Sequence, residues 1–188
     1  MEYKEFGTWL QAELGCKAQK LSVDAGLTCP NRDGTLGRGG CTFCDNRTFN
    51  PAYCRQGGSI TDQLEAGKRF FSRKYPTMKY LAYFQSYSNS YGTLSHLKEL
   101  YEEALRVPDV VRLVIGTRPD CMPDALLEYL EELNRRTFLL VEYGVESANE
   151  ETLVRVNRGH TFAQARECII RTAQRGIRVG VHMILGFP

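Results

Sequence analysis

Short apolar runs alternate with amphipathic segments along most of the chain. Four runs are clear and a weaker one precedes them, at residues 20–25, 80–85, 111–117, 138–145 and 177–185. Continuous apolar runs of this length are typical of strands buried on both faces, and their alternation with helices is the pattern of βαβ units. The pattern predicts an α/β fold with five strands in a parallel sheet.

The segments between the later runs carry apolar residues at helical spacing. Helices are predicted to begin after Thr93, behind Pro123 and after Thr161, because threonine caps helix N-termini and proline suits the first turn. Gly176 is placed to end the third helix. The residues that share these helical faces are Leu94, Leu97, Tyr101, Ala104 and Leu105, then Leu126, Leu127, Leu130 and Leu133, and then Phe162, Ala165, Cys168, Ile169 and Ala173. Right-handed crossovers through such helices predict an open or closing (βα) barrel.

Only Gly186, Phe187 and Pro188 follow the last apolar run before the chain ends. A parallel strand is normally covered by a helix, and an α/β domain rarely ends on an uncovered one. We therefore expect a partial (βα) barrel that is truncated after its fifth strand. Residues 1–188 would be the N-terminal part of one domain, with at least one further βα unit missing.

Composition agrees with one ordinary globular domain, since 43% of the 188 residues are hydrophobic and 24% are charged. The formal net charge of +2 argues against a protein that binds polyanions with its whole surface. Residues 1–10 have no apolar run, so they do not form a signal peptide, and no later stretch reaches 18 apolar residues. We expect a cytoplasmic protein with no membrane contact, in which the seven cysteines are metal ligands or thiols rather than disulfides.

Three of these cysteines, Cys29, Cys41 and Cys44, lie in one loop after the first predicted strand. The loop 27–44 reads LTCPNRDGTLGRGGCTFC, and its four glycines let the backbone turn back so that three thiolates reach one centre. A closed structural site normally has four protein ligands, so three leave a coordination position open. In a 4Fe-4S cluster that position is an iron without a protein ligand. S-adenosylmethionine (SAM) has the amino and carboxylate groups to bind it.

A zinc site is the alternative interpretation of the same loop. Cys54, or a histidine from elsewhere, would then supply the fourth ligand. The position of the loop at the end of the first strand favours an active site at the mouth of a barrel. The remaining cysteines, Cys16, Cys121 and Cys168, are expected to be buried or free thiols.

These residues resemble the radical SAM superfamily. Eleven residues separate Cys29 from Cys41 and two separate Cys41 from Cys44, a long first spacing similar to the branch that contains the tRNA-modifying catalytic subunit of Elongator and related bacterial proteins. Phe43 fits the aromatic position before the last cysteine. The likeness spans residues 20–188 and includes TRPD at 117–120, YGVES at 143–147, NRGHT at 157–161 and the ending 182–188.

The resemblance implies a partial barrel of the radical SAM type and a 4Fe-4S cluster held by the three cysteines. It implies reductive cleavage of SAM to a 5′-deoxyadenosyl radical that abstracts hydrogen from a substrate, for which RNA is one candidate. The electron would come from an external donor of the flavodoxin or ferredoxin type. The substrate itself is not indicated, and no residue is assigned as catalytic.

Five residues are expected to contact SAM: Phe43, Ser86, Arg118, Glu142 and Glu146. Ser86 lies where the superfamily has a glycine-rich motif, although the stretch here, QSYSN at 85–89, has no glycine. Arg118 follows the end of a strand. Glu142 and Glu146 are evenly spaced in an apolar strand and would share its inward face, where carboxylates are costly unless they bind something. Glu146 replaces the glutamine of the Elongator-like motif.

Neither His160 nor His182 is assigned to the site. His160 is expected to orient the turn at Gly159, and the face of His182 on its strand cannot be assigned from the sequence.

A nucleic-acid-binding module is the second class of function. Residues 68–75 mix cations with aromatic rings, which would suit single-stranded RNA. A helix that buries Ile60, Leu64, Phe70 and Phe71 explains the same segment more simply. A zinc-stabilised nucleic-acid-binding module without catalysis is kept as the alternative function.

Overall fold

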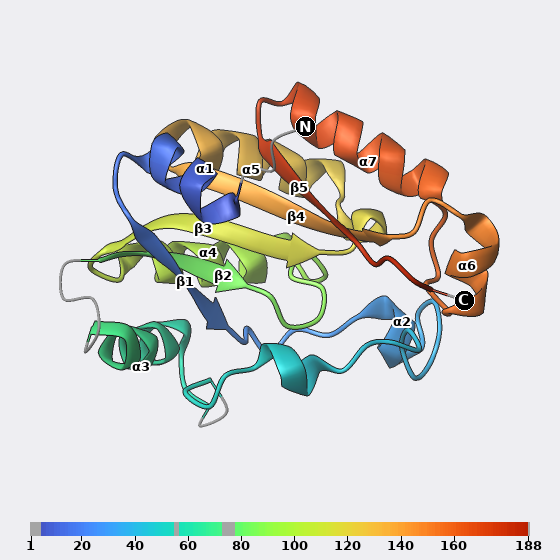
Figure 1. Ribbon diagram of the computed structural model, residues 1–188, viewed down its shortest axis with the longest axis horizontal. Coiled ribbons are helices and arrows are strands. Elements are labelled where there is room, and N and C mark those ends of the chain that lie inside the picture. The colour runs from blue at the N-terminus through green and yellow to red at the C-terminus, as the bar shows by residue number, and fades with distance from the viewer. Residues whose placement is uncertain (1–4, 55–56, 73–77, 188) are drawn as a thin grey trace.

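The computed structural model describes residues 5–54, 57–72 and 78–187, with the side chains of residues 47 and 49 excepted. Its five strands form one parallel sheet in which each strand pairs with its neighbours in sequence order (Figure 1). The strands are β1 (Ala18–Val23), β2 (Lys79–Phe84), β3 (Val110–Thr117), β4 (Phe138–Glu146) and β5 (Arg178–Met183). This order is the beginning of a (βα) barrel, so the predicted α/β class and partial barrel are confirmed.

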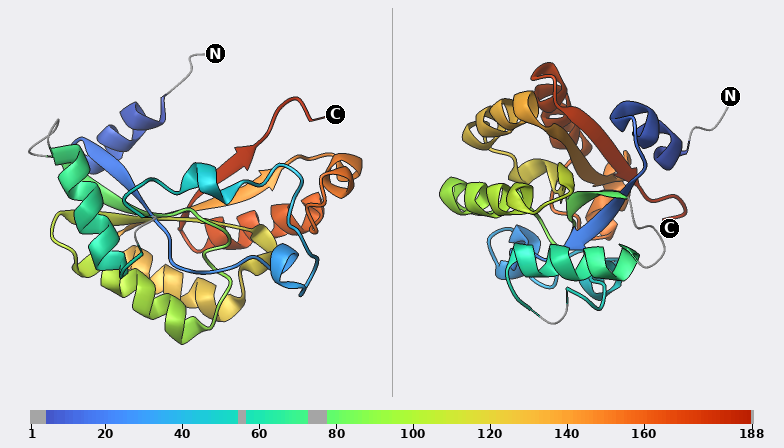
Figure 2. Two further views of the ribbon diagram at one scale, coloured as in Figure 1. Left: turned by 90° about the horizontal axis from the view of Figure 1, so that it is seen from below. Right: turned by 90° about the vertical axis from the view of Figure 1, so that its left-hand side faces the viewer.

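Helices connect consecutive strands and lie along one face of the sheet, whereas the first helix lies on the other (Figure 2). The long connecting helices are α3 (Ile60–Ser72), α4 (Leu94–Arg106), α5 (Asp124–Arg136) and α7 (Phe162–Gln174), and the first helix is α1 (Phe6–Leu14). Short segments are α2 (Pro30–Asp33), α6 (Glu150–Arg155) and the 3-10 turns η1 (Asn46–Phe49) and η2 (Pro119–Cys121). The predicted cap at Thr161 is present as a reciprocal capping box with Gln164.

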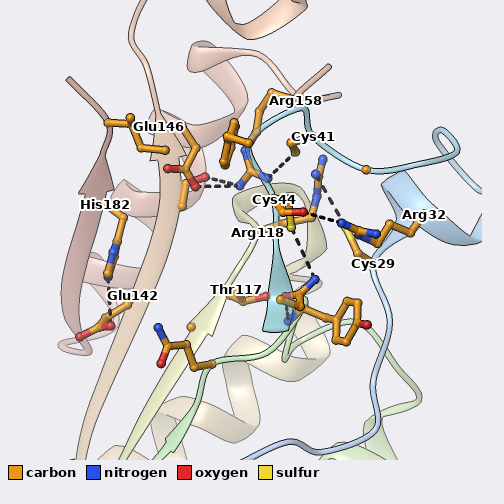
Figure 3. Close-up of a pocket in the computed structure, with 18 of the residues that line it drawn as sticks. Cys29, Arg32, Cys41, Cys44, Thr117, Arg118, Glu142, Glu146, Arg158 and His182 are labelled. Carbon is orange, nitrogen blue, oxygen red and sulfur yellow. Dashed lines mark hydrogen bonds and ion pairs between the residues drawn. The ribbon is translucent and has the colours of Figure 1, made fainter. Parts of the chain in front are cut away.

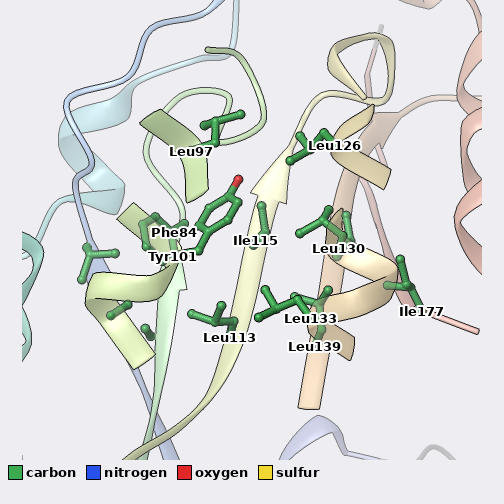
Figure 4. Packing of buried hydrophobic residues seen from close by; sticks show 14 of the residues in the cluster. Phe84, Leu97, Tyr101, Leu113, Ile115, Leu126, Leu130, Leu133, Leu139 and Ile177 are labelled. Atoms are coloured by element: carbon green, nitrogen blue, oxygen red, sulfur yellow. The ribbon is translucent and has the colours of Figure 1, made fainter. Parts of the chain in front are cut away.

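The larger hydrophobic core lies between the sheet and the outer helices (Figure 4). Leu113 and Ile115 of β3 and Leu130 of α5 are completely buried there. A smaller core on the opposite face contains Leu10 of α1 together with inward residues of the sheet such as Val114. Strands β2 to β4 are therefore buried on both faces, which explains their continuous apolar runs.

The fifth strand differs from the other four. It ends at Met183 rather than at residue 185, and its residues are half-buried or exposed. Helix α1 was not predicted from the sequence, although it supplies the second core. No described helix is long and apolar enough to cross a membrane. The proposed missing unit beyond Pro188 stays a prediction.

Candidate functional site

A cavity of about 350 Å³ lies at the carboxyl ends of the strands, where active sites of parallel barrels are found. The connection after β1 contributes the three cysteines of the loop, and the connection after β2 contributes Gln85 and Tyr87. Strands β3, β4 and β5 add residues at or near their carboxyl ends. These are Thr117 and Arg118, then Glu142, Gly144 and Glu146, and then His182 and Met183. Figure 3 shows the cysteine loop facing Glu142, Glu146 and His182 across this space.

The cysteine loop is shaped by glycine directly before its second cysteine. Gly39 and Gly40 have φ angles of +84° and +82°, which other residues rarely adopt. A Cβ atom at Gly40 would also lie 2.8 Å from Nε of Arg32. The loop therefore needs glycine to bring Cys41 back to the wall that Cys29 and Cys44 share.

The three cysteines of the cavity suit an iron-sulfur cluster better than a structural zinc ion. Within the described part of the chain, no three or more His, Cys, Asp or Glu side chains are grouped so that they could hold a metal ion. Each cysteine of a 4Fe-4S cluster binds a different iron, so three sulfurs spread along one cavity wall are compatible with a cluster. A structural zinc ion instead needs four donors around one point.

Cys54, the fourth ligand in the zinc interpretation, lines a different cavity. Its thiol donates a hydrogen bond to the carbonyl of Ser22 at 3.0 Å, and burial raises its pKa to about 11. The donor set of the main cavity therefore fits a cluster held by three cysteines.

Arg118 is almost fully buried in the wall, with 3% of its surface exposed. Its guanidinium group forms a two-pronged ion pair with Asp120, at 2.9 Å from Nε to Oδ1 and 2.8 Å from Nη2 to Oδ2. Its third nitrogen, Nη1, lies 4.0 Å from Sγ of Cys29. The residue predicted to face SAM is thus oriented by Asp120 and directed toward the first cysteine.

Ser86 is buried and, among the residues described, is not part of the cavity wall, in contrast to its expected contact with SAM. Its neighbours Gln85 and Tyr87 line the wall instead. The chain bends at Ser86 and Tyr87, and Tyr87 has a φ angle of +63°. The carbonyl of Ser86 accepts a hydrogen bond from Nδ2 of Asn89 at 3.1 Å, so Ser86 anchors the loop.

Glu142 is buried at the middle of β4 between the side chains of Lys20 and His182. Lys20 of β1 donates to Oε1 at 2.5 Å, and Nε2 of His182 lies 3.0 Å from Oε2. Burial alone would raise the pKa of Glu142, but the hydrogen bond with His182 and the positive charge and hydrogen bond of Lys20 outweigh it and hold the pKa at about 2. Gly180 stands opposite, and a Cβ atom there would lie 3.0 Å from Cγ of Glu142. The glycine leaves room for the carboxylate to reach His182.

Glu146 lies on the same cavity, although not through regular alternation along the strand. The pairing of β4 with β5 shifts register between Gly144 and Glu146, and Glu146 has a φ angle of +70°. A bulge rather than an undisturbed strand therefore turns its side chain inward, which corrects the reasoning behind the prediction. Its nearest charged partner is Arg158, at 3.7 Å, and burial raises the pKa of Glu146 above its ordinary value.

Phe43 lines the cavity, and its ring centroid lies 5.3 Å from that of Phe187. This contact joins the cysteine loop to the segment after β5. The predicted aromatic position is thus on the wall, on its apolar side.

Arg158 and His182 are among the wall residues that were not assigned from the sequence. Arg158 is 6% exposed and donates to the carbonyl of Gly144, while His182 is held by Glu142, which raises the pKa of the imidazole. The NRGHT motif already contained Arg158. The place of His182 depends on the register between β4 and β5, which no local pattern shows. His160 is buried, and its Nδ1 lies 3.2 Å from the carbonyl oxygen of Thr161.

The family to which these features point can be identified by comparison. A sequence model of the radical SAM superfamily matches residues 29–188, starting at the first of the three cysteines. The chain belongs to the radical SAM superfamily. Members of the superfamily generally use a 4Fe-4S cluster and SAM.

The chain is similar to protein YhcC of Escherichia coli strain K12. The two are 40% identical over 184 residues, which cover 97% of this chain and 58% of YhcC. This radical SAM chain thus spans less than two thirds of the length of that relative.

Two solved structures share the fold. The Methanocaldococcus infernus Elp3 with an N-terminal deletion has a TM-score of 0.57 and 18% identity, over 91% of this chain and 38% of that one. The cobalamin-dependent radical enzyme OxsB, solved with aqua-cobalamin and SAM bound, has a TM-score of 0.55 and 16% identity, over 87% of this chain and 23% of that one. At such identities the likeness concerns the radical SAM fold alone.

Proposed function

We propose that this chain is the cluster- and SAM-binding part of a radical SAM enzyme, with Cys29, Cys41 and Cys44 as ligands of a 4Fe-4S cluster. The observation that carries the proposal is that one glycine-shaped loop brings these three cysteines to the wall of a cavity that residues of strands β2, β3, β4 and β5 also line. When bound, the cluster supplies the electron for cleavage of SAM into methionine and a 5′-deoxyadenosyl radical, which takes hydrogen from the substrate.

Oppositely charged side chains of the wall match the charged groups of SAM. The guanidinium of Arg158 attracts a carboxylate, and its Nε has no hydrogen-bond partner among the described residues. The carboxylate of Glu146 accepts from an ammonium or a hydroxyl group. Arg118 supplies a second positive charge beside the cysteines.

Apolar and indirect contacts complete the proposed SAM site. Phe43 packs against the apolar parts of the cofactor. Glu142 contributes less than Glu146, because Lys20 and His182 already occupy its oxygens. Ser86 acts through the loop that it anchors.

Two partners belong to the proposal as well. A low-potential one-electron donor, of the flavodoxin or ferredoxin type, supplies the electron from outside. RNA is the candidate substrate on the strength of the Elongator-like motifs. The zinc-stabilised module is not favoured, because Cys54 lines a separate cavity.

The test is anaerobic reconstitution followed by metal and product analysis. We expect about four irons and four sulfides per chain, and 5′-deoxyadenosine on addition of dithionite and SAM, measured by mass spectrometry. Cys41→Ala should lose the cluster completely. Cys168→Ala, the same exchange in a buried cysteine of α7, should keep it. Stoichiometric zinc without iron in the parent protein, or loss of the metal from Cys54→Ala, would contradict the proposal.

A further inference from the structure

Every sulfur of the three cysteines has an N–H group directed toward it. Cys41 Sγ lies 3.5 Å from Nη1 of Arg158 and 3.6 Å from Nδ2 of Asn31. Cys44 Sγ lies 3.5 Å from Nδ2 of Asn46. Cys29 Sγ has Nη1 of Arg118 at 4.0 Å, at the limit of such a contact. We call these four residues the sulfur-facing donors.

The sulfur-facing donors come from separate parts of the chain. Arg118 follows β3, and Arg158 lies between α6 and α7, at sequence separations of 89 and 117 residues from the cysteines they face. Asn31 and Asn46 belong to the cysteine loop and to the turn after it. The tertiary fold therefore brings the two arginines to the sulfurs, whereas the two asparagines are close to the cysteines in the sequence.

Asn46 is the donor whose orientation is best defined. Its Oδ1 accepts a hydrogen bond from the backbone N–H of Tyr87 at 3.1 Å. An amide whose oxygen faces an N–H must present its nitrogen on the other side, so the NH2 group points to Cys44. The connection after β2 thus orients a donor for a cysteine of the first loop.

Donors of this kind affect a cluster through its charge. A 4Fe-4S cluster with three thiolate ligands carries more negative charge after it accepts one electron. N–H groups and positive charges near the sulfurs stabilise the reduced form more than the oxidised form, and hydrogen bonds to sulfur are among the factors that set the potential. Arg118 and Arg158 are both nearly buried, so their charges are weakly screened by solvent.

We propose that the sulfur-facing donors are positioning residues that raise the reduction potential of the cluster, and that Asn46 does so through Cys44. The inference rests on the proposed function, since it requires the cluster. The one-electron reductant is the low-potential external donor, for which dithionite substitutes in solution. The consequence is a cluster that is easier to reduce before SAM cleavage.

The experiment is a redox titration of the reconstituted protein with dithionite, followed by electron paramagnetic resonance of the reduced cluster. Asn46→Asp keeps the acceptor for Tyr87 and removes the donor, while Asn46→Leu removes the donor without adding charge. Both should lower the potential, with Asn46→Asp lowering it more. We expect Asn46→Leu to reduce the ratio of reduced to oxidised cluster about tenfold at a fixed solution potential, which is about 59 mV for one electron.

Asn149→Asp is the matched control, because Asn149 caps α6 through Oδ1 at 3.0 Å from the N–H of Thr152, and aspartate caps equally well. It should keep the potential of the parent. If Asn149→Asp and Asn46→Asp shift the reduction potential equally, the cause is the added net charge, and the role of Asn46 as a donor is overturned. So would an unchanged potential in Asn46→Leu.

Two further outcomes separate this inference from the proposed function. If the parent is loaded and both Asn46 variants lose the cluster, Asn46 is needed for assembly and its tuning role is overturned. If the parent itself holds no iron-sulfur cluster, the proposed function fails and the inference fails with it.

Discussion

The middle of β4 and its carboxyl end each carry a glutamate that lines the same cavity, and the surroundings shift the pKa values of the two in opposite directions. Glu142 lies in the regular part of the strand between Lys20 and His182, which keep its pKa at about 2. Glu146 lies in the bulge, where burial raises its pKa and its nearest cation is 3.7 Å away. The first carboxylate is already satisfied within the fold. The second is available to a ligand.

The largest effect is expected from removing the carboxylate in the middle of the strand. Glu142→Ala leaves Lys20 and His182 without their shared partner, and breaking a buried ion pair costs about 3–5 kcal/mol. Because Lys20 and His182 are partly exposed, we expect a loss of about 2–3 kcal/mol in the free energy of unfolding. Urea denaturation measures it.

A double variant provides the control for this loss. Lys20→Met combined with Glu142→Gln should cost less than the two single changes added together, because the pair of Lys20 and Glu142 is removed as a whole and neither of the two is left charged without the other. Strict additivity would mean that Lys20 and Glu142 do not interact in solution.

The second prediction concerns the pH dependence of stability. The pKa of Glu142 in the folded protein, about 2, lies below its ordinary 4.5, so its contribution is fully present above pH 4.5 and is lost as the pH falls toward 2. That contribution should amount to about 2–3 kcal/mol. Glu142→Gln should therefore show a shallower decline in stability between pH 4.5 and 2 than the parent. Parallel curves would contradict the low pKa.

The third prediction moves to the end of the strand and to SAM binding. Glu146→Ala should weaken SAM binding by about 1–3 kcal/mol, or roughly ten- to a hundredfold, because one hydrogen-bonding partner of the ligand is lost. Calorimetric titration into the reconstituted protein measures the affinity. Unchanged affinity together with a lower melting temperature would make Glu146 structural and would remove the contrast with Glu142.

The smallest effect is expected from Glu146→Gln, which keeps the shape and restores the residue of the Elongator-like motif. SAM affinity should change by less than in Glu146→Ala, with the cluster retained. Because the pKa of Glu146 is raised in the folded protein, its contribution to stability is present below pH 4.5 and is lost as the pH rises through the folded pKa. At neutral pH, Glu146→Gln should therefore be at least as stable as the parent. A clear loss of stability would show that the charged form is favoured by the fold.

Much of the architecture could be predicted because its signals are local. Strands β2 to β4 are buried on both faces, and a strand buried on both faces appears in the sequence as a continuous apolar run. The caps at Thr93 and Thr161 act within one helical turn. Helix α1 escaped prediction, because the smaller core that it joins brings together residues far apart in the sequence, such as Leu10 and Phe138.

The candidate site divides in the same way. The sequence alone was enough to predict the cysteine loop as a metal-binding loop, since it has three cysteines and four glycines within 18 residues. Only the tertiary structure decided which of the two glutamates, Glu142 or Glu146, already has hydrogen-bond partners for its carboxylate. Lys20 is 122 residues from Glu142, and His182 reaches it through the register of β4 with β5 and the missing side chain at Gly180. Contacts of this kind depend on how strands align, and alignment is set by the packing of the whole sheet rather than by any local run of residues.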